Sequence, residues 1–408
     1  MAILVEHGTI LDGTGRPPQS GSLLIDGNRI AAIGRPGDAA LRARATTVVD
    51  ARGGTVLPGL MNLHAHIHRR HMSWARDETL PFRFRYPQIE TQPEAQAILH
   101  ALNNAWYELR RGATTIRDTG SRVFLSHTLK RALGSGLFHG PRIVTSGKII
   151  CMTGGHGAGS GQEADGPDAV RRAAREQLKM GADWVKVAAT AGLSGMPEKE
   201  DPRMVELTCE ELTAAAQEAH KRGRRIAAHA DANDGIKNSL RAGIDSIEHG
   251  VYLDDEAIAM MREQGTFLVP TMSGLYNLYR REEAAGNTDF SSILRDEVIG
   301  PHRESVAMAY KAGITIATGT DTLGELVQEI EMLHDAGLPP MEAILAATRN
   351  AARVLGWEKD LGTLEAGKKA DVVIVDGDPL ADLSVLRRVK TVILDGHIVT
   401  AEWLMPSA

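Results

Sequence analysis

The sequence predicts an α/β fold in which a (β/α)8 TIM-type barrel carries a small β-sandwich domain built from both termini. Three observations lead to this fold class. The chain has 408 residues, which suits a barrel of roughly 250 residues with additions. Its middle alternates short apolar runs with helix-like stretches. Both of its ends are rich in β-like runs and tight turns.

The two ends of the chain are expected to share one sheet domain. Near the N-terminus, two apolar runs flank Asp26-Gly27-Asn28, which is a hairpin signal. Similar β-like runs occupy residues 370–399. We therefore predict a composite β-sandwich domain from residues 1–57 plus 360–408, and a (β/α)8 barrel at 58–359. The alternative is two separate caps.

The middle of the chain supplies the eight strands that such a barrel needs. They are mostly apolar on both faces, as a parallel sheet covered by helices requires. The predicted strands are Val56–His66, Thr114–Asp118, Arg142–Ile149, Trp184–Val187, Ile226–Ala230, Ser246–Glu248, Phe267–Pro270 and Thr315–Thr318. Helices are predicted between them at Glu94–Arg111, Asp168–Met180, Cys209–Arg222, Asp254–Gln264 and Arg303–Ala312.

Composition excludes several classes of function. The net charge of −6 gives no basic stripe for nucleic acid and no polybasic membrane signal. No apolar run reaches the roughly 20 residues that span a bilayer, and the N-terminus lacks a signal-peptide pattern. The two cysteines, Cys151 and Cys209, cannot form a disulfide framework. We expect a cytoplasmic homo-oligomer that acts on a small-molecule substrate.

Four long loops follow predicted strands at the rim where a barrel places its active site. They span residues 68–92, 151–166, 189–207 and 272–300. Loops of this length are unusual unless they serve a function. We expect them to form the walls of a substrate pocket.

Metal-binding side chains end several of these strands. His64 and His66 close the first one, and residues two apart in a strand share a face. The pair His66 and His68 is the rival assignment. Lys186 interrupts an otherwise apolar strand, where an ammonium is costly to bury. It is either a snorkelling or ion-paired lysine, or a lysine whose burial-lowered pKa lets it take up CO2 as a carbamate.

Three further donors follow later strands. His229 and His249 end consecutive strands, and Asp321 follows the eighth. A lone Asp at this position could instead cap the helix that begins near Glu325. Because a barrel collects the C-terminal ends of its strands at one rim, all six donors are expected to converge there.

Taken together, these motifs resemble the amidohydrolase superfamily, and within it imidazolonepropionases and Xaa-Pro dipeptidases. The resemblance covers essentially the full length. Its motifs include Leu57–His66, Thr153-Gly154-Gly155-His156-Gly157, Gly319-Thr320-Asp321 and residues 362–371. It implies a distorted barrel with a composite β-sandwich and a binuclear site, commonly zinc.

By that resemblance the six donors would hold two divalent cations. His64, His66 and Asp321 would bind one, and His229 and His249 the other. N-carboxylated Lys186 and a hydroxide would bridge them.

The resemblance also suggests roles in catalysis and substrate binding. Asp321 would accept a proton from the attacking hydroxide and pass it to the leaving nitrogen. His156, between flexible glycines, would contact the substrate carbonyl or carboxylate. Arginines crowd the first loop, and Arg69 or Arg70 could clamp a carboxylate. Tyr276 could line the pocket. The alternative for each of these loop residues is a structural or solvated side chain.

One position departs from the pattern of dipeptidase-like relatives. Many of them carry Tyr two residues after the fifth-strand histidine, where it can polarise a carbonyl. Here that residue is Asp231, and an acid cannot donate a hydrogen bond unless it is protonated. This departure favours another amide, such as an N-acyl amino acid, over an Xaa-Pro dipeptide, with Asp231 in the substrate site.

The leading expectation is a binuclear metal-dependent amidohydrolase that cleaves a peptide or N-acyl amino acid of small, carboxylate-bearing type by a metal-bridging hydroxide. Cyclic-amide, ester or organophosphate hydrolysis is an alternative, because the same hydroxide attacks all of these. A mononuclear deaminase is a further rival, but it does not need Lys186. A catalytically inactive scaffold protein is disfavoured by retention of all six donors.

Overall fold

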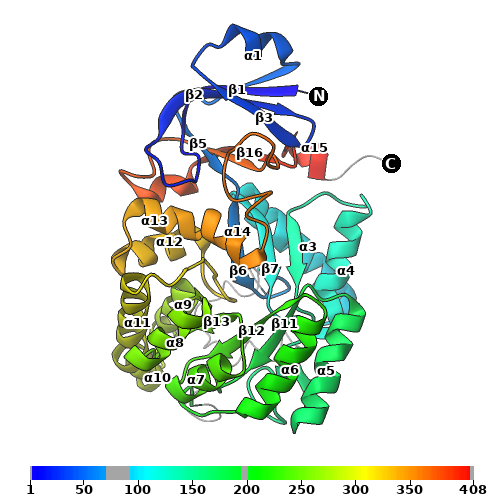
Figure 1. Ribbon diagram of the computed structural model, residues 1–408, viewed down its shortest axis with the longest axis vertical. Helices are drawn as coiled ribbons and strands as arrows, with labels where there is room; N and C mark the ends of the chain where they lie inside the picture. The colour runs from blue at the N-terminus through cyan, green and yellow to red at the C-terminus, as the bar shows by residue number, and fades with distance from the viewer. Residues whose placement is uncertain (1, 70–91, 194–200, 405–408) are drawn as a thin grey trace.

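The computed structural model describes residues 2–69, 92–193 and 201–404. It consists of a terminal sheet above a larger α/β body (Figure 1). Within the described residues, no helix combines the length and apolar character needed to cross a bilayer. Both cysteines are free thiols.

Strands from both ends of the chain form one eight-stranded sheet, as predicted. The order is β17-β16-β15-β5-β1-β2-β3, and β4 pairs with β1. Antiparallel pairing of Val56 with Ile374 joins the N-terminal and C-terminal parts. Its strands are β1 (Ala2–Ile10), β2 (Gln19–Asp26), β3 (Arg29–Gly34), β4 (Thr47–Asp50), β5 (Thr55–Pro58), β15 (Val372–Val375), β16 (Val389–Leu394) and β17 (His397–Ile398).

This sheet has its own apolar core. Ile3, Ile25, Ile374 and Ile393 are among its fully buried side chains. The expected hairpin is confirmed, because Asp26 pairs with Arg29 and Gly27 adopts a positive φ of 57°. The short helix α1 (Ala39–Arg44) begins at Asp38, whose side chain caps it.

The body is a parallel barrel with eight strand positions around the ring. Regular strands fill the first seven positions, and isolated bridges form the eighth. Its strands are β6 (Leu60–Ala65), β7 (Ala113–Asp118), β8 (Arg142–Thr145), β9 (Ile150–Cys151), β11 (Trp184–Ala188), β12 (Arg225–Ala230), β13 (Ser246–His249) and β14 (Phe267–Val269). The third position is shared, because β8 pairs with β7 whereas β9 pairs with β11.

The eighth position closes the ring through isolated bridges rather than a regular strand. Leu268 of β14 pairs with Ile316, and Ala65 of β6 pairs with Asp321. The Leu63 N–H also donates to the Thr318 carbonyl at 2.8 Å. The (β/α)8 prediction is therefore confirmed.

Amphipathic helices cover the outside of the barrel (Figure 1). They are α3 (Glu94–Arg110), α4 (Leu125–Gly134), α5 (Pro167–Met180), α6 (Cys209–Lys221), α7 (Asn233–Arg241), α8 (Asp255–Gln264), α11 (Gly300–Lys311), α12 (Leu326–Asp335), α13 (Pro340–Ala346) and α14 (Arg349–Leu355). Local sequence sets their ends. Thr208 and Glu211 form a capping box on α6, and α5 ends at Gly181 in the left-handed region. The remaining short elements are β10 (Gln162–Glu163), α15 (Ala401–Leu404) and 3-10 turns at Arg122–Phe124 and Leu383–Arg387.

Besides the predicted strand Thr315–Thr318, which forms only an isolated bridge at Ile316, two predictions of local structure were wrong. The single strand Val56–His66 is divided at Gly59 into β5 and β6, which belong to different sheets. A Cβ at Gly59 would lie 2.2 Å from the Thr114 Oγ1, so only glycine fits where the chain passes β7.

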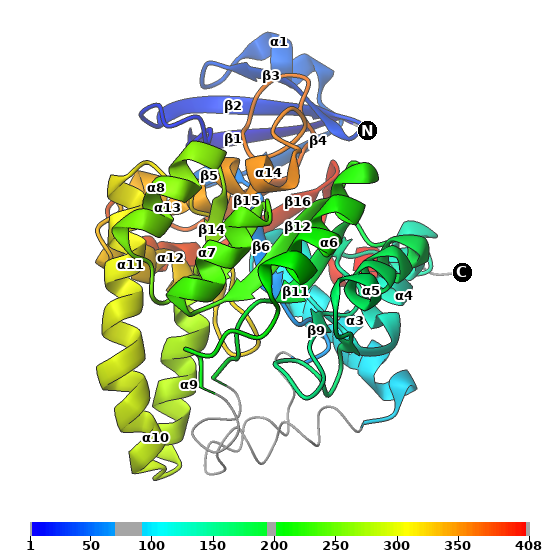
Figure 2. The same cartoon turned by 60° about the horizontal axis from the view of Figure 1, so that its bottom comes forward.

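The second error is the predicted loop 272–300, which is helical throughout most of its length. It contains α9 (Met272–Ala284), α10 (Thr288–Ile293) and a π-helical turn at Leu294–Ile299. Figure 2 shows α9 and α10 extending beside the open end of the barrel. Leu275, Leu278, Leu294 and Val298 bury against one another, and that spacing is the helical apolar pattern that the loop reading missed.

Candidate metal centre and active site

A cavity opens at the C-terminal ends of the barrel strands, and all six predicted metal ligands line it. The volume of this cavity is about 810 Å³, including the part that is open to solvent. The ligands reach it from β6, β11, β12, β13 and the segment after Ile316, so the convergence expected from the barrel geometry is observed. These residues are His64, His66, Lys186, His229, His249 and Asp321.

The closing bridge of the barrel brings the first three donors together. The Asp321 N–H donates to the His64 carbonyl at 2.8 Å, and Asp321 has a positive φ of 53°. The His66 Nε2 lies 3.4 Å from the Asp321 Oδ1. One ligand atom from each of His64, His66 and Asp321 falls within 4.8 Å of the others, so this group could hold a cation.

The rival readings of these positions do not match the structure. His68 is buried, but it does not line the cavity, and its Nε2 accepts from the Arg69 Nε at 3.2 Å. Asp321 does not cap the following helix, because α12 begins at Leu326 with Glu325 as its N-cap residue.

The second pair of histidines lies across the same cavity. Register pairs Ala230 with His249 on neighbouring strands, so His229 and His249 end side by side. Their ring centroids are 4.6 Å apart, and the His249 ring is 4.8 Å from that of His64. The two groups of donors are therefore contiguous.

Lys186 is buried in β11 with 1% exposure and faces the cavity. Among the described residues its Nζ has no hydrogen-bond partner. Burial lowers the pKa of Lys186 to about 8, although Glu248 opposes that shift. Carbamate formation requires an unpaired, buried amine with a lowered pKa, and Lys186 meets this requirement. The alternative of an ion-paired lysine is not supported, because the Nζ has no partner among these residues.

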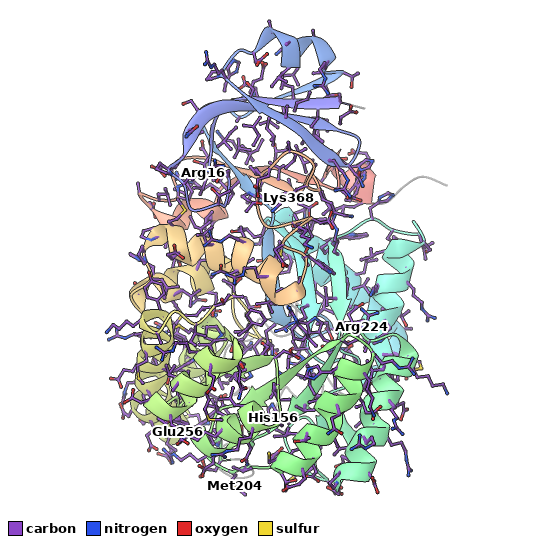
Figure 3. The ribbon with its side chains drawn as sticks, in the orientation of Figure 1. Arg16, His156, Met204, Arg224, Glu256 and Lys368 are labelled. Carbon is purple, nitrogen blue, oxygen red and sulfur yellow. The ribbon has the colours of Figure 1, made fainter. Side chains whose placement is uncertain are left out.

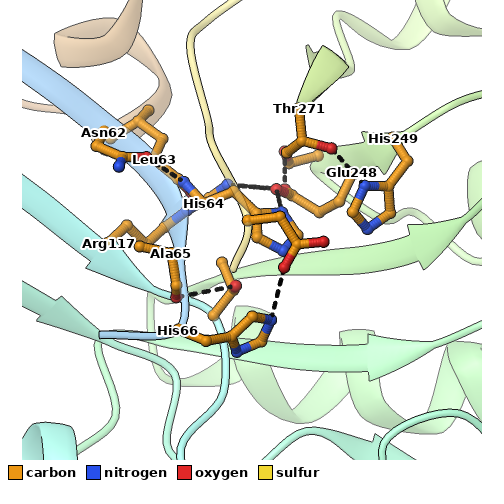
Figure 4. A network of polar contacts seen from close by, with 12 residues as sticks. Asn62, Leu63, His64, Ala65, His66, Arg117, Glu248, His249 and Thr271 are labelled. Atoms are coloured by element: carbon orange, nitrogen blue, oxygen red, sulfur yellow. Dashed lines mark hydrogen bonds and ion pairs between the residues drawn. The ribbon is translucent and has the colours of Figure 1, made fainter. Parts of the chain in front are cut away.

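In each of the four histidines one ring nitrogen contacts another group of the protein, which orients the ring. Figure 4 shows the contacts of His64 with Glu248 and of His249 with Thr271. The Nδ1 atoms of His64, His66 and His249 contact the Glu248 carboxylate (2.7 Å), the Gly120 carbonyl (2.7 Å) and the Thr271 hydroxyl (2.6 Å). The Nε2 of His229 lies 3.2 Å from the Ala191 carbonyl. Three Nε2 atoms and one Nδ1 are thus left to act as ligands, and such outer contacts are typical of metal-binding histidines.

Electrostatics also suits ligation. Burial lowers the pKa of His66 to about 4, and those of His64, His229 and His249 well below the usual value. These imidazoles are neutral at pH 7 and keep a lone pair. Burial raises the pKa of Asp321, but the histidines and Lys186 outweigh it and hold the value at about 2.

Sequence reasoning missed a buried ionic network behind His64. Glu248 is fully buried and accepts from Arg117 at 2.7 and 2.9 Å and from the Ser246 hydroxyl at 2.6 Å. Arg117 also donates to the Leu63 carbonyl and stacks over Trp184 at 4.5 Å. The available signal was the one used for Lys186, a charged residue inside an apolar strand.

His156 reaches the cavity from the glycine-rich loop and lies in the barrel part of the molecule (Figure 3). Its ring stacks on His229 with centroids 4.0 Å apart and an interplanar angle of 16°. Glu206 fixes the loop by accepting from the His156 N–H at 2.9 Å. A Cβ on Gly192 would lie 2.3 Å from the His156 ring, so a glycine is needed there.

Of the remaining residues predicted to bind substrate, two line the cavity and two do not or lie outside the described residues. Arg69 and Asp231 line the cavity, and Arg70 lies outside the described residues. Tyr276 does not line this cavity; it lines a separate one with Met272 and His302. The helix α9 turns its i and i+3 positions, Leu275 and Leu278, toward the metal candidates, which directs Tyr276 elsewhere.

A (β/α)8 barrel whose strand ends gather imidazole, amine and carboxylate donors around one cavity has the architecture of a metal-binding barrel enzyme. The model of the Amidohydrolase family matches residues 55–399, and the chain belongs to this family.

Relatives span nearly the whole chain. Ochratoxinase of Aspergillus niger is 29% identical over 418 residues, covering 95% of this chain and 84% of the relative. A solved Xaa-Pro dipeptidase with methionine bound in its active site is 31% identical, with a TM-score of 0.85 over 98% of this chain and 100% of that one. A prolidase complexed with N-methylphosphonate-L-proline is 29% identical, with a TM-score of 0.86 over 98% and 100%. The resemblance is confirmed, and the chain is a hydrolase.

Proposed function

We propose that this protein is a two-metal amide hydrolase acting on a small peptide or N-acyl amino acid. The observation that carries the proposal is the convergence of six donors on one cavity, with neutral imidazoles and an ionised Asp321. The similarity to ochratoxinase and Xaa-Pro dipeptidase supports hydrolysis of an amide bond.

The residues present fit two divalent cations. His64, His66 and Asp321 would hold one, and His229 and His249 the other, with carboxylated Lys186 between them. The buried Nζ of Lys186, which has no hydrogen-bond partner among the described residues, and the second ring nitrogen of each of the four histidines support this assignment. Zinc suits such a set of nitrogen and oxygen donors. When bound, two such ions supply a water of lowered pKa and polarise a carbonyl.

The chain's own groups would manage the proton and the substrate. Asp321 lies at the cavity wall, ionised, and would accept a proton and deliver it to the leaving amide nitrogen. His156 would hydrogen-bond the substrate carbonyl or carboxylate from the stack on His229. Leu275 and Leu278 line the same cavity and would give the substrate an apolar wall.

The test combines a substrate screen with metal analysis. Zinc-loaded protein is assayed against a library of dipeptides and N-acyl amino acids, and metals per chain are counted. We expect amide cleavage with two metals, and Asp321→Asn should lower kcat by about a hundredfold or more with metal content nearly intact. One metal per chain with ammonia release would instead indicate a deaminase. Unchanged turnover in Asp321→Asn would remove that residue from the mechanism.

A further inference from the structure

We propose that Asp231 makes this site select substrates that carry a free, positively charged amino group beside the scissile amide. The inference rests on the proposed amide hydrolase function and narrows its substrate class to dipeptide-like zwitterions. N-acyl amino acids lack that charge and would be poor substrates, which reverses the preference that the sequence alone suggested for Asp231.

Two charged side chains of opposite sign line the cavity in addition to the proposed metal ligands. Among the described lining residues these are Arg69 and Asp231. Arg69 follows β6, the first barrel strand, and its N–H donates to the His66 carbonyl at 2.9 Å. Asp231 follows β12, the fifth strand. The first and fifth of eight strands lie opposite each other in a closed ring, so the segments that carry Arg69 and Asp231 leave the barrel on opposite sides.

The backbone of Asp231 is fixed at the cavity wall, and its side chain is buried there. The residue is only 1% exposed. Its N–H donates to the Thr190 hydroxyl at 3.0 Å, and its carbonyl accepts from the Tyr252 N–H at 3.1 Å. The Asp231 Oδ2 lies 3.5 Å from the His229 Nε2, which places this anion directly beside a proposed metal ligand.

An anion in such a poorly solvated place discriminates by charge. It attracts a substrate ammonium strongly, because charge-assisted hydrogen bonds gain strength away from water. It repels a carboxylate or a carbonyl oxygen in the same position. The substrate atoms nearest β12 should therefore be cationic, and a substrate carboxylate belongs on the opposite side.

Arg69 provides that opposite side. It is 7% exposed, and its Nη2 donates to the Ser160 hydroxyl at 2.5 Å, so its guanidinium is positioned at the cavity wall. The same cavity is also lined by the apolar side chains of Leu193, Leu275, Leu278 and Leu323. The complementary molecule is a dipeptide with an apolar side chain, its ammonium toward Asp231 and its carboxylate toward Arg69.

The test compares two substrates that differ only in the ammonium. Leucyl-leucine and its des-amino analogue, N-(4-methylpentanoyl)-leucine, share the scissile amide, both side chains and the carboxylate. For the zinc-loaded wild type we expect kcat/KM to favour the dipeptide on the order of tenfold to a hundredfold. In Asp231→Asn this ratio should fall to within about threefold, through loss of activity on the dipeptide, while metal content stays the same.

The matched control is Asp234→Asn. It removes the same charge three residues away, from an exposed position on α7, and should keep the wild-type ratio. Equal cleavage of the two substrates by the wild type would overturn the inference and leave amide hydrolysis standing. Parallel loss on both substrates in Asp231→Asn would also overturn it. Failure to cleave any amide of the library would overturn the proposed function and this inference with it.

Discussion

The most decisive structural prediction concerns Glu248, which holds the proposed ligand His64 from behind. Its carboxylate accepts from Arg117 at 2.7 and 2.9 Å, from the Ser246 hydroxyl at 2.6 Å and from the His64 ring at 2.7 Å, all in a fully buried place. Glu248→Gln keeps the shape and removes the charge. Arg117, with 0% exposure, then loses its carboxylate partner among the residues that the structure describes and remains buried and charged.

The expected loss in the free energy of unfolding follows from leaving the buried Arg117 charge without its partner. Breaking one partner of a buried ion pair costs about 3–5 kcal/mol, and the Gln oxygen recovers a small part, so we expect about 3 kcal/mol from urea unfolding of the metal-free protein. Removing an outer contact of a metal-binding histidine should also weaken zinc binding by about 10–100-fold. Both quantities can be measured on one preparation, by urea titration and by competition with a zinc chelator.

The control is Asp296→Asn. Asp296 pairs with Arg295 on the surface, where both side chains are more than half exposed, so its loss should leave unfolding and zinc affinity unchanged. Wild-type stability and wild-type zinc affinity in Glu248→Gln would refute the reasoning, because they would mean that the network neither stabilises the barrel nor orients His64.

Three further predictions are independent of that network. Lys186→Met should reduce bound zinc from about two ions to about one, measured by elemental analysis, because it removes the proposed bridge; two retained ions would contradict the carbamate role. Burial raises the pKa of Glu329 from 4.5 to about 7, so the folded protein holds a proton that the unfolded chain releases, and stability should fall as pH rises through this window. Urea midpoints of Glu329→Gln should lack that slope; an identical pH profile would exclude Glu329 as its source. Gly192→Ala should displace the His156 ring and lower kcat/KM by about tenfold or more with metal content unchanged, whereas wild-type kinetics would show that the stack on His229 is dispensable.

The metal-site residues that lie at the ends of regular strands were the easiest to predict from the sequence. His64, Lys186, His229 and His249 lie at or near the ends of regular apolar strands, and one topological rule brings such residues to one rim. Asp321 follows a segment that forms only isolated bridges, but the apolar run before it still marked the eighth strand.

Features that depend on partners distant in sequence were harder to predict. Glu248 and Arg117 are 131 residues apart, and only the folded barrel pairs them. The break at Gly59 had a local signal in the Pro58-Gly59 dipeptide, which the single-strand prediction overlooked. The need for glycine there depends on how closely the chain passes Thr114. The direction of Tyr276 depended on a helix, α9, whose apolar spacing was mistaken for a loop.

The isolated β-bridge between Ala65 and Asp321 bears on how the molecule matures. It closes the barrel between the first and the eighth strand positions. The donors His64 and His66 lie on one side of this closure and Asp321 on the other. A cation bound by these three residues would link the two sides of the closure. An incomplete chain that ends before Asp321 would lack one of the three donors, so metal binding at this point would report that the barrel has closed.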